Sequence, residues 1–416
     1  VADTKEPLLW RIITVFMFRS LRNSNKKPMI LHMVTWYPVH ENDIDGIFIR
    51  RQIELLAADK SYNHVIVQHS SKPMSIWKQV KGLAGIFNVR RVGHFDVVEL
   101  MNESTYNKRI IWRYKKQIWR KQLSALIKSV RPSLLHLHEV YGFAKEAVAA
   151  KENWNIPFVV TEHMAPFPFP WIQDKETYIK KPLQLARSVI AVGQAQAQQI
   201  LDFTGVRATI IPNVVNSREF HYADKKQTDE QLHFVLVGIY DSRKGADYLL
   251  QTLPAFFKIY PQAVLHLVGD ASPERMKHLK ELAERGGIKN EVQFHGKLTA
   301  ANICKLYHQC DFYVCSSEWE SFGVSVLEAL FTGLPVLSTN CGGVLEFMNE
   351  TNGLLISNDR QQQTLLNGLV QMAATCKQYN RKQIAEQVHH HFSEEYIQQQ
   401  YLDIYKNVLR TQLSAA

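Results

Sequence analysis

Short apolar runs alternate with longer stretches of helical periodicity along nearly all of the 416-residue chain. Uninterrupted apolar runs are typical of parallel strands buried on both faces, and their alternation with helices is the pattern of βαβ units. The runs form two series. The first comprises residues 30–34, 65–67, 97–100, 134–137, 158–161, 189–192 and 209–211, and the second comprises 234–237, 264–268, 292–294, 312–315, 336–338 and 354–356. This pattern predicts an α/β protein with two Rossmann-like domains.

The polar, charge-rich residues 216–231 separate the two series and are interpreted as an interdomain linker. The chain end has the periodicity of an amphipathic helix. The expected parts are therefore a leader (1–28), a first domain (29–214), a linker (215–231), a second domain (232–390) and a C-terminal helix (391–416). An apolar stretch in the leader is broken by Arg11 and Arg19, which fits either an interfacial amphipathic helix or a poorly ordered chain end.

The stretch 315–339 contains the polar residues that most strongly indicate a ligand site. It follows a buried strand, passes through an acidic loop with Glu320, and then takes on a helical pattern from about Ser321. Open α/β sheets bind ligands beyond the carboxyl ends of their strands, and the first turn of a helix attracts phosphate. The amides expected to face such a phosphate belong to Ser321, Phe322 and Gly323.

Glu320 and Glu328 are separated by seven residues. On a helix this spacing gives about 12 Å of rise and an offset of roughly 80°, so the two carboxylates can hold different parts of one long ligand. The alternative is a solvated helix-terminal charge and an ordinary surface residue. The stretch resembles the E-x7-E signature of family-4 retaining glycosyltransferases. That resemblance implies that Glu320 positions a donor sugar and Glu328 takes ribose hydroxyls.

The resemblance also implies the GT-B fold: two facing Rossmann-like domains, an interdomain cleft, and a C-terminal helix that returns to the first domain. Residues 237–245 support it, because a lysine at a helix start beside glycines suits a diphosphate. Lys244 matches the family's lysine. Ile239 occupies the position of the family's arginine, for which Arg243 is the candidate replacement. Without the resemblance, Arg243 and Lys244 would be interpreted as surface charges.

Two positions in the first domain complete the expected site. Gly46 starts a helix after the first strand and resembles the family's N-terminal glycine, which lies against the diphosphate or the acceptor. His163 follows a strand and matches the family's T-x-H position beside the donor sugar, although a lone histidine is more often structural. The aromatic loop ending at Trp171 would either stack on an acceptor or pack on itself.

Metal binding is not expected. His136 and His138 suggest a ligand pair, but without a third residue of clear spacing they are interpreted as strand-end core histidines. GT-B enzymes generally need no metal, so the resemblance implies no cofactor beyond the nucleotide sugar.

The segment 108–131, from Lys108 to Arg131, is rich in Lys and Arg, has no acidic residue and contains interleaved aromatics. With a net charge of +10, this pattern favours an anionic membrane surface. A solvated outer helix is the alternative. Nucleic acid is not the expected partner, because no recognition motif accompanies the basic residues.

The five cysteines show no paired spacing, which favours a reducing, cytoplasmic compartment, with peripheral attachment to the inner face of the cytoplasmic membrane as an option. The expected activity is transfer of a sugar from a nucleoside diphosphate sugar to a glycan or lipid-linked hydroxyl, with retention of anomeric configuration, in surface polysaccharide or glycolipid synthesis. The alternatives are a non-catalytic nucleotide-sugar-binding scaffold and another GT-B enzyme, such as a nucleotide-sugar epimerase.

Overall fold

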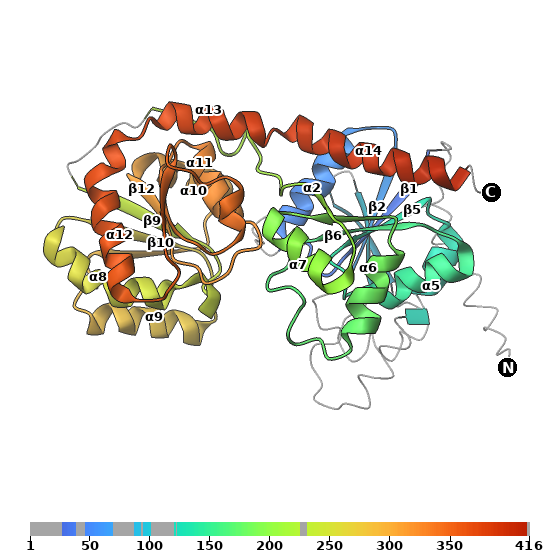
Figure 1. Ribbon diagram of the computed structural model, residues 1–416, viewed down its shortest axis with the longest axis horizontal. Coiled ribbons are helices and arrows are strands. Elements are labelled where there is room, and N and C mark those ends of the chain that lie inside the picture. Colours follow the sequence, from blue (N-terminus) through green and yellow to red (C-terminus); the bar gives the residue numbers. More distant parts are fainter. Residues whose placement is uncertain are drawn as a thin grey trace.

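The computed structural model describes residues 27–38, 46–69, 87–92, 95–100, 120–121, 123–224 and 231–413. These residues form two α/β domains side by side, each built around one β-sheet (Figure 1). The predicted fold class is confirmed. Within the described residues, none of the helices is both long and apolar enough to cross a membrane.

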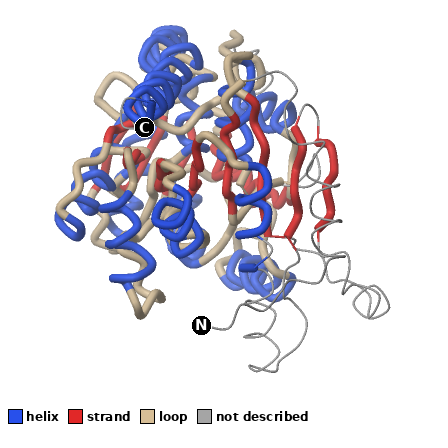
Figure 2. Tube along the Cα trace, turned by 90° about the vertical axis from the view of Figure 1, so that its right-hand side faces the viewer, coloured by secondary structure: helices blue, strands red, loops and turns tan. Residues whose placement is uncertain are grey.

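The first sheet has eight strands in the order β3-β4-β2-β1-β5-β6-β7-β8, and only β3 runs antiparallel to its neighbour. The strands are β1 (Met29–Val34), β2 (Asn63–His69), β3 (Phe87–Val92), β4 (Phe95–Leu100), β5 (Leu134–His138), β6 (Phe158–Glu162), β7 (Ser188–Ala191) and β8 (Thr209–Ile210). Helices cover both faces of this sheet (Figure 2). Parallel strands covered on both sides must be apolar throughout, which explains why β1, β5 and β6 are buried along their whole length.

The second sheet has six parallel strands in the order β11-β10-β9-β12-β13-β14. They are β9 (His233–Val237), β10 (Val264–Val268), β11 (Val292–Gly296), β12 (Phe312–Cys315), β13 (Val336–Thr339) and β14 (Gly353–Ile356). Chain order reverses on the two sides of β1 in the first sheet and of β9 in the second. Ligands of such sheets bind beyond the carboxyl ends of the strands at these switch points.

The helices of the first domain include α2 (Ile47–Ala58), α5 (Ala144–Trp154), α6 (Lys181–Leu185) and α7 (Gln194–Thr204), and residues 123–130 are also helical. Those of the second domain are α8 (Ala246–Ile259), α9 (Pro273–Arg285), α10 (Ala300–Gln309), α11 (Val324–Phe331), α12 (Gln362–Thr375) and α13 (Arg381–His391). All five cysteines are buried and free.

The last helix, α14 (Glu394–Leu413), leaves the second domain and lies along the first (Figure 1). Its buried residues Ile397, Tyr401 and Tyr405 pack in one hydrophobic cluster with strand residues of the first sheet, among them Ile30 and Leu134. This confirms the predicted return of the C-terminal helix to the first domain. The burial of these apolar faces is what holds α14 in place.

The strands expected from apolar runs are present with small differences at their ends. The strand β3 was missed, because the adjacent residues Arg90 and Arg91 break its apolar pattern and an edge strand needs no continuous apolar run. The helix expected from about Ser321 begins only at Val324, with Gly323 as its N-cap at φ 88°. Ser321 and Phe322 therefore belong to the turn before the helix and not to its first turn.

Candidate active site

The turn after β9 is built to hold a lysine near the end of β12. Asp241 caps the short helix η2 (Ser242–Lys244), because its side chain accepts hydrogen bonds from the amides of Arg243 and Lys244 at 3.0 and 3.3 Å. Gly245 then turns the chain at φ +68°, where a Cβ would lie 1.9 Å from the carbonyl oxygen of Ser316. The turn is therefore packed backbone to backbone against the strand end that leads to Glu320.

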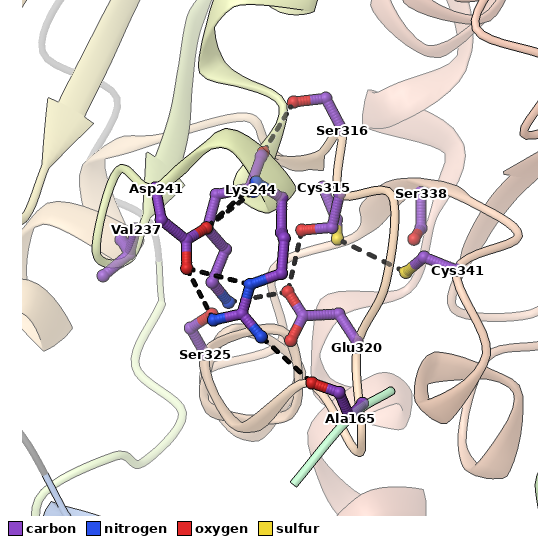
Figure 3. Close-up of polar contacts among 12 residues, drawn as sticks. Ala165, Val237, Asp241, Lys244, Cys315, Ser316, Glu320, Ser325, Ser338 and Cys341 are labelled. Carbon is purple, nitrogen blue, oxygen red and sulfur yellow. Dashed lines mark hydrogen bonds and ion pairs between the residues drawn. The ribbon is translucent and has the colours of Figure 1, made fainter. Parts of the chain in front are cut away.

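Lys244 and Glu320 meet at this point (Figure 3). The Nζ atom of Lys244 lies 2.6 Å from Oε1 of Glu320, and the Ser317 hydroxyl donates to the same oxygen at 2.7 Å. The backbone of Glu320 is also fixed, since its amide donates to Cys341 and its carbonyl accepts from Gly343. Burial works to lower the pKa of Lys244, but the Glu320 carboxylate outweighs it and raises that pKa. The result is a fixed ammonium–carboxylate pair at the switch point of the second sheet.

Arg243 links this pair to the first domain. Its guanidinium binds the Asp241 carboxylate at 2.5 Å and donates from Nη1 to the carbonyl oxygen of Ala165 at 3.1 Å. Ala165 lies two residues after His163. The contact thus brings the basic turn of the second domain to the loop that follows β6.

His163 is buried at the end of β6, with 4% of its surface exposed. Its Nδ1 atom lies 3.0 Å from Oδ1 of Asn213, and since an amide oxygen only accepts, Nδ1 carries the proton. Nε2 is then a lone-pair acceptor, and it has no hydrogen-bond partner among the described residues. Burial lowers the pKa of His163 to about 3, against the opposing effect of Asn213, so the ring is neutral at pH 7. The unpartnered Nε2 atom of this neutral imidazole can accept a hydrogen bond from a hydroxyl group.

Gly46 precedes α2 and adopts φ +75°. A Cβ at this position would lie 2.5 Å from the carbonyl oxygen of Trp36, so close backbone packing alone requires glycine here. Two residues further on, Phe48 places its ring 5.0 Å from that of His163. The start of α2 and His163 are therefore neighbours.

Glu328 lies on α11 and is paired with a residue that the sequence did not single out. Its Oε1 accepts from Nη1 of Arg51 at 2.5 Å, and Nη2 of Arg51 binds Glu219 at 3.0 Å. Burial raises the pKa of Glu328, while the guanidinium of Arg51 pulls it down. Nothing in the spacing of α2 marks Arg51, because its partners come from far along the chain.

Of the residues between Glu320 and Glu328, Phe322 belongs to the hydrophobic core and Gly323 forms the start of α11. Phe322 is fully buried and packs its ring against Phe347 and Phe392, at 5.3 and 6.3 Å between ring centroids. Only its backbone can serve a ligand. Gly323 caps α11, whose first amides have no partners within the helix.

A histidine cluster lies behind His163 in the core of the first domain. One ring nitrogen from each of His32, His136 and His138 lies within 4.8 Å of the others, a grouping that can hold a metal ion. His32 was missed in the sequence, since only strand pairing places it beside His136. Its two nitrogens bond His64 at 2.8 Å and His138 at 3.0 Å.

His136 in turn bonds the hydroxyls of Tyr405 and Thr161, at 2.6 and 2.8 Å. Burial lowers the pKa values of His32, His136 and His138 well below the usual range, so the rings are neutral. Each ring of the cluster thus has a protein partner, and the cluster ties the first sheet to α14.

Two further expectations concern the aromatic loop and the basic segment. In the aromatic loop, Phe167 and Phe169 are buried and pack together, whereas Trp171 is 50% exposed. Most of the segment 108–131 lies outside the described residues. Within its described part, Leu126 and Ile127 are buried in the first-domain core, and Arg120 pairs with Glu146 at 2.9 Å.

Comparison with known proteins identifies two adjoining family matches. Residues 217–388 match the family described as glycosyl transferases group 1, and residues 103–219 match glycosyltransferase family 4. A phosphatidylinositol N-acetylglucosaminyltransferase protein from Arabidopsis thaliana is 23% identical over 242 residues. That match covers 56% of this chain and 53% of the relative, so the chain spans about half of the relative's length.

Two solved structures share the fold over nearly the whole chain. Sucrose-phosphate synthase from Thermosynechococcus elongatus superposes with a TM-score of 0.74 at 19% identity, covering 94% of this chain and 100% of that one. HepE from Anabaena, solved in complex with UDP and glucose, gives a TM-score of 0.66 at 18% identity and covers 91% and 100%.

Proposed function

The chain belongs to the family-4 GT-B glycosyltransferases, and from that premise we propose that it is a retaining enzyme that moves a sugar from a nucleoside diphosphate sugar to an acceptor hydroxyl. The observation that carries the proposal is the fixed Lys244–Glu320 pair, which Arg243 joins to the loop behind His163. Two cations and a carboxylate thus lie near the end of β12, and Arg243 contacts the loop that follows His163 in the first domain.

The proposed chemistry begins with the departure of the nucleoside diphosphate, which builds negative charge on the leaving phosphate. Lys244 and Arg243 would stabilise that charge, helped by the amides of Ser321, Phe322 and Gly323 before α11. Since these groups are held in place before the donor arrives, little reorganisation is needed during the reaction.

The sugar would lie between the two domains. Glu320 would accept hydrogen bonds from its hydroxyls, and Nε2 of His163 would accept another from the opposite side. Gly46 would let the diphosphate or the acceptor approach the start of α2, and Glu328 would take the ribose hydroxyls. The leaving phosphate itself would accept the proton of the attacking hydroxyl, so no side chain is proposed as a covalent nucleophile.

The proposed acceptor is a glycan or a lipid-linked glycan, in polysaccharide or glycolipid synthesis. The Arabidopsis relative is named for a phosphatidylinositol substrate, which supports a lipid-linked acceptor. The proposal also includes a membrane contact. The basic segment 108–131 would bind the anionic inner face of the cytoplasmic membrane. Its test is binding to anionic vesicles, which neutralising Lys115, Lys116 and Lys121 should weaken.

Transfer is proposed to need no metal ion, because Lys244 and Arg243 supply the positive charge that a metal would otherwise provide. Dialysis against EDTA should leave turnover unchanged. A loss of turnover that added Zn²⁺ restores would overturn this proposal and direct attention to His32, His136 and His138.

The test of the function uses UDP-glucose, UDP-N-acetylglucosamine and GDP-mannose as donors, with octyl glycosides as acceptors. The variants Glu320→Gln and Lys244→Met should lower product formation by roughly 10²- to 10³-fold, the usual effect of removing one group that stabilises developing charge. Lys258→Met, an exposed change on α8, is the matched control and should retain the parent's rate. NMR of the product should show the donor's anomeric configuration.

Binding of a nucleotide sugar without any transfer to an acceptor would favour the scaffold alternative. Conversion of the donor sugar itself would favour an epimerase.

A further inference from the structure

Arg51 crosses the boundary between the two domains. It lies on α2 in the first domain, while its guanidinium contacts Glu328 on α11 at 2.5 Å and Glu219 at 3.0 Å. The Cζ atom also lies 5.4 Å from the ring centroid of Phe220, a fully buried residue of the second domain's core cluster. One side chain of the first domain is thereby inserted among side chains of the second.

Both members of the Arg51–Glu328 pair are almost completely buried, with side chains 7% and 9% exposed. Glu219 is more open, at 41%. A buried charge without its partner is strongly disfavoured, so each of the two buried groups fixes the other. The neighbouring Arg50 differs sharply, because it pairs with Glu54 on the same exposed helix face.

The geometry leaves part of Glu328 free. Arg51 donates from Nη1 to Oε1 of Glu328 and from Nη2 to Glu219. It therefore does not bind both oxygens of the Glu328 carboxylate. Within the described part of the chain, no hydrogen bond reaches Oε2 of Glu328. A carboxylate accepts about four hydrogen bonds, so Glu328 can hold Arg51 and still receive two hydroxyls of a ligand.

We propose that Arg51 is a positioning residue of the donor site, which aims the Glu328 carboxylate at the ribose from across the domain boundary. This rests on the proposed function, in which Glu328 takes the ribose hydroxyls. It follows that the ribose site is not complete in the second domain alone. Recognition of the ribose then depends on α2 being docked, and so on the relative position of the two domains.

The test measures binding of UDP and of GDP by calorimetry, together with the 2′,3′-dideoxy form of whichever nucleotide binds. Each nucleotide differs from its dideoxy form only in the two ribose hydroxyls, so the comparison measures recognition of those hydroxyls. It can be made without knowing which sugar the donor carries. The parent should prefer the ribonucleotide by about 10-fold or more, the discrimination expected when buried polar groups lose their partners. Arg51→Met should lose most of that preference, and Arg51→Lys should restore part of it.

Three further variants separate positioning from a general loss of structure. Arg50→Met, on the same helix, should keep the parent's preference. Glu219→Gln should change the ribose preference by less than about threefold, because the Glu219 side chain is 41% exposed and solvent screens its ion pair. Glu328→Gln should abolish the preference, and adding Arg51→Met to it should cause no further loss, since both changes remove one interaction. Melting curves of all variants check that each is folded.

A pH profile supplies an independent readout. Removing the guanidinium leaves a buried carboxylate without its cation, which raises its pKa. Ribonucleotide binding by Arg51→Met should therefore weaken at a higher pH than in the parent as the solution is acidified, and Glu328→Gln should lack this step.

The outcomes distinguish this inference from the proposed function. A parent that binds neither nucleotide would refute both. A parent that prefers the ribonucleotide, with a folded Arg51→Met that keeps the preference, would refute the role of Arg51 and leave the proposed function standing.

Discussion

At the scale of single residues, two glycines with nearly equal backbone angles provide a direct comparison. Gly245 has φ +68° and Gly205 has φ +75°, but a Cβ at Gly245 would meet the Ser316 carbonyl at 1.9 Å, whereas nothing lies within 4 Å at Gly205. Gly205→Ala should cost about 1–2 kcal/mol of unfolding free energy, from the left-handed backbone alone. Gly245→Ala should cost more and weaken nucleotide binding, because the clash displaces the turn that carries Lys244.

Denaturant titration and calorimetry with UDP and GDP measure the two effects. Equal losses of stability in the two variants, with unchanged nucleotide binding in Gly245→Ala, would contradict the packing argument.

The same scale shows what the sequence could and could not predict about the site. Lys244, Arg243 and Glu320 stand in local motifs next to strand ends, and they do lie together. Their roles toward the donor remain predictions. Arg51 and His32 could not be found this way, because each is defined by partners that only the tertiary fold brings near. A buried arginine carries no local signature in a helix whose other buried positions are mostly apolar.

At the scale of elements, α14 is held to the first sheet by polar contacts as well as apolar ones. The Tyr405 hydroxyl lies 2.6 Å from Nδ1 of His136, whereas the Tyr401 hydroxyl is 3.5 Å from Thr161. Tyr405→Phe should cost about 1–3 kcal/mol of unfolding free energy, because it leaves a buried ring nitrogen unpaired. Tyr401→Phe should cost less than about 1 kcal/mol, because a contact at this distance is weak.

Urea denaturation, followed by circular dichroism, compares these two variants with the parent. A cost for Tyr401→Phe equal to that for Tyr405→Phe would show that the hydroxyl of Tyr405 contributes nothing particular to the docking of α14.

Strands that are buried on both faces could be predicted from the sequence, whereas strands at the edge of a sheet were harder to predict. Strands such as β10 and β12 are buried on both faces and match their apolar runs residue for residue. The edge strand β3 pairs on one side only, and Arg90 and Arg91 interrupt the alternation of its sequence, so periodicity alone does not distinguish it from a loop. The late start of α11 follows from the bridge between Glu320 and Gly342, which holds the chain extended before Gly323 can turn it.

At the scale of the whole molecule, side-chain contacts join the two domains at the carboxyl ends of their sheets. Arg243 reaches Ala165, Arg51 reaches Glu328, and the Glu346 side chain accepts from the amide of Gln194. Away from these contacts, the apolar face of α14 packs against the first domain. A ligand that touches both domains would therefore add substantially to the contacts that couple them.

This arrangement predicts how the donor should change thermal unfolding. A ligand stabilises the parts of the protein that it contacts, by about 2.7 kcal/mol at a hundred times its dissociation constant. A nucleoside diphosphate would contact the second domain and would depend on α2 of the first domain through the Arg51–Glu328 pair. An intact nucleotide sugar would in addition reach His163 of the first domain. At equal saturation, UDP or GDP should therefore raise the unfolding temperatures of both domains, and the matching nucleotide sugar should raise that of the first domain further.

Calorimetric scans with UDP, GDP, UDP-glucose and GDP-mannose test these predicted shifts in unfolding temperature. The nucleotide base whose ligands stabilise the protein identifies the class of donor. Lys244→Met should reduce every shift, because it removes the cation at the diphosphate. His163→Ala should reduce only the extra effect of the sugar, because in the proposed site its unpartnered Nε2 would bond to the sugar and not to the diphosphate. If His163→Ala instead reduced the shift produced by the nucleoside diphosphate itself, His163 would have to contact the phosphates, and the sugar would lie elsewhere between the domains.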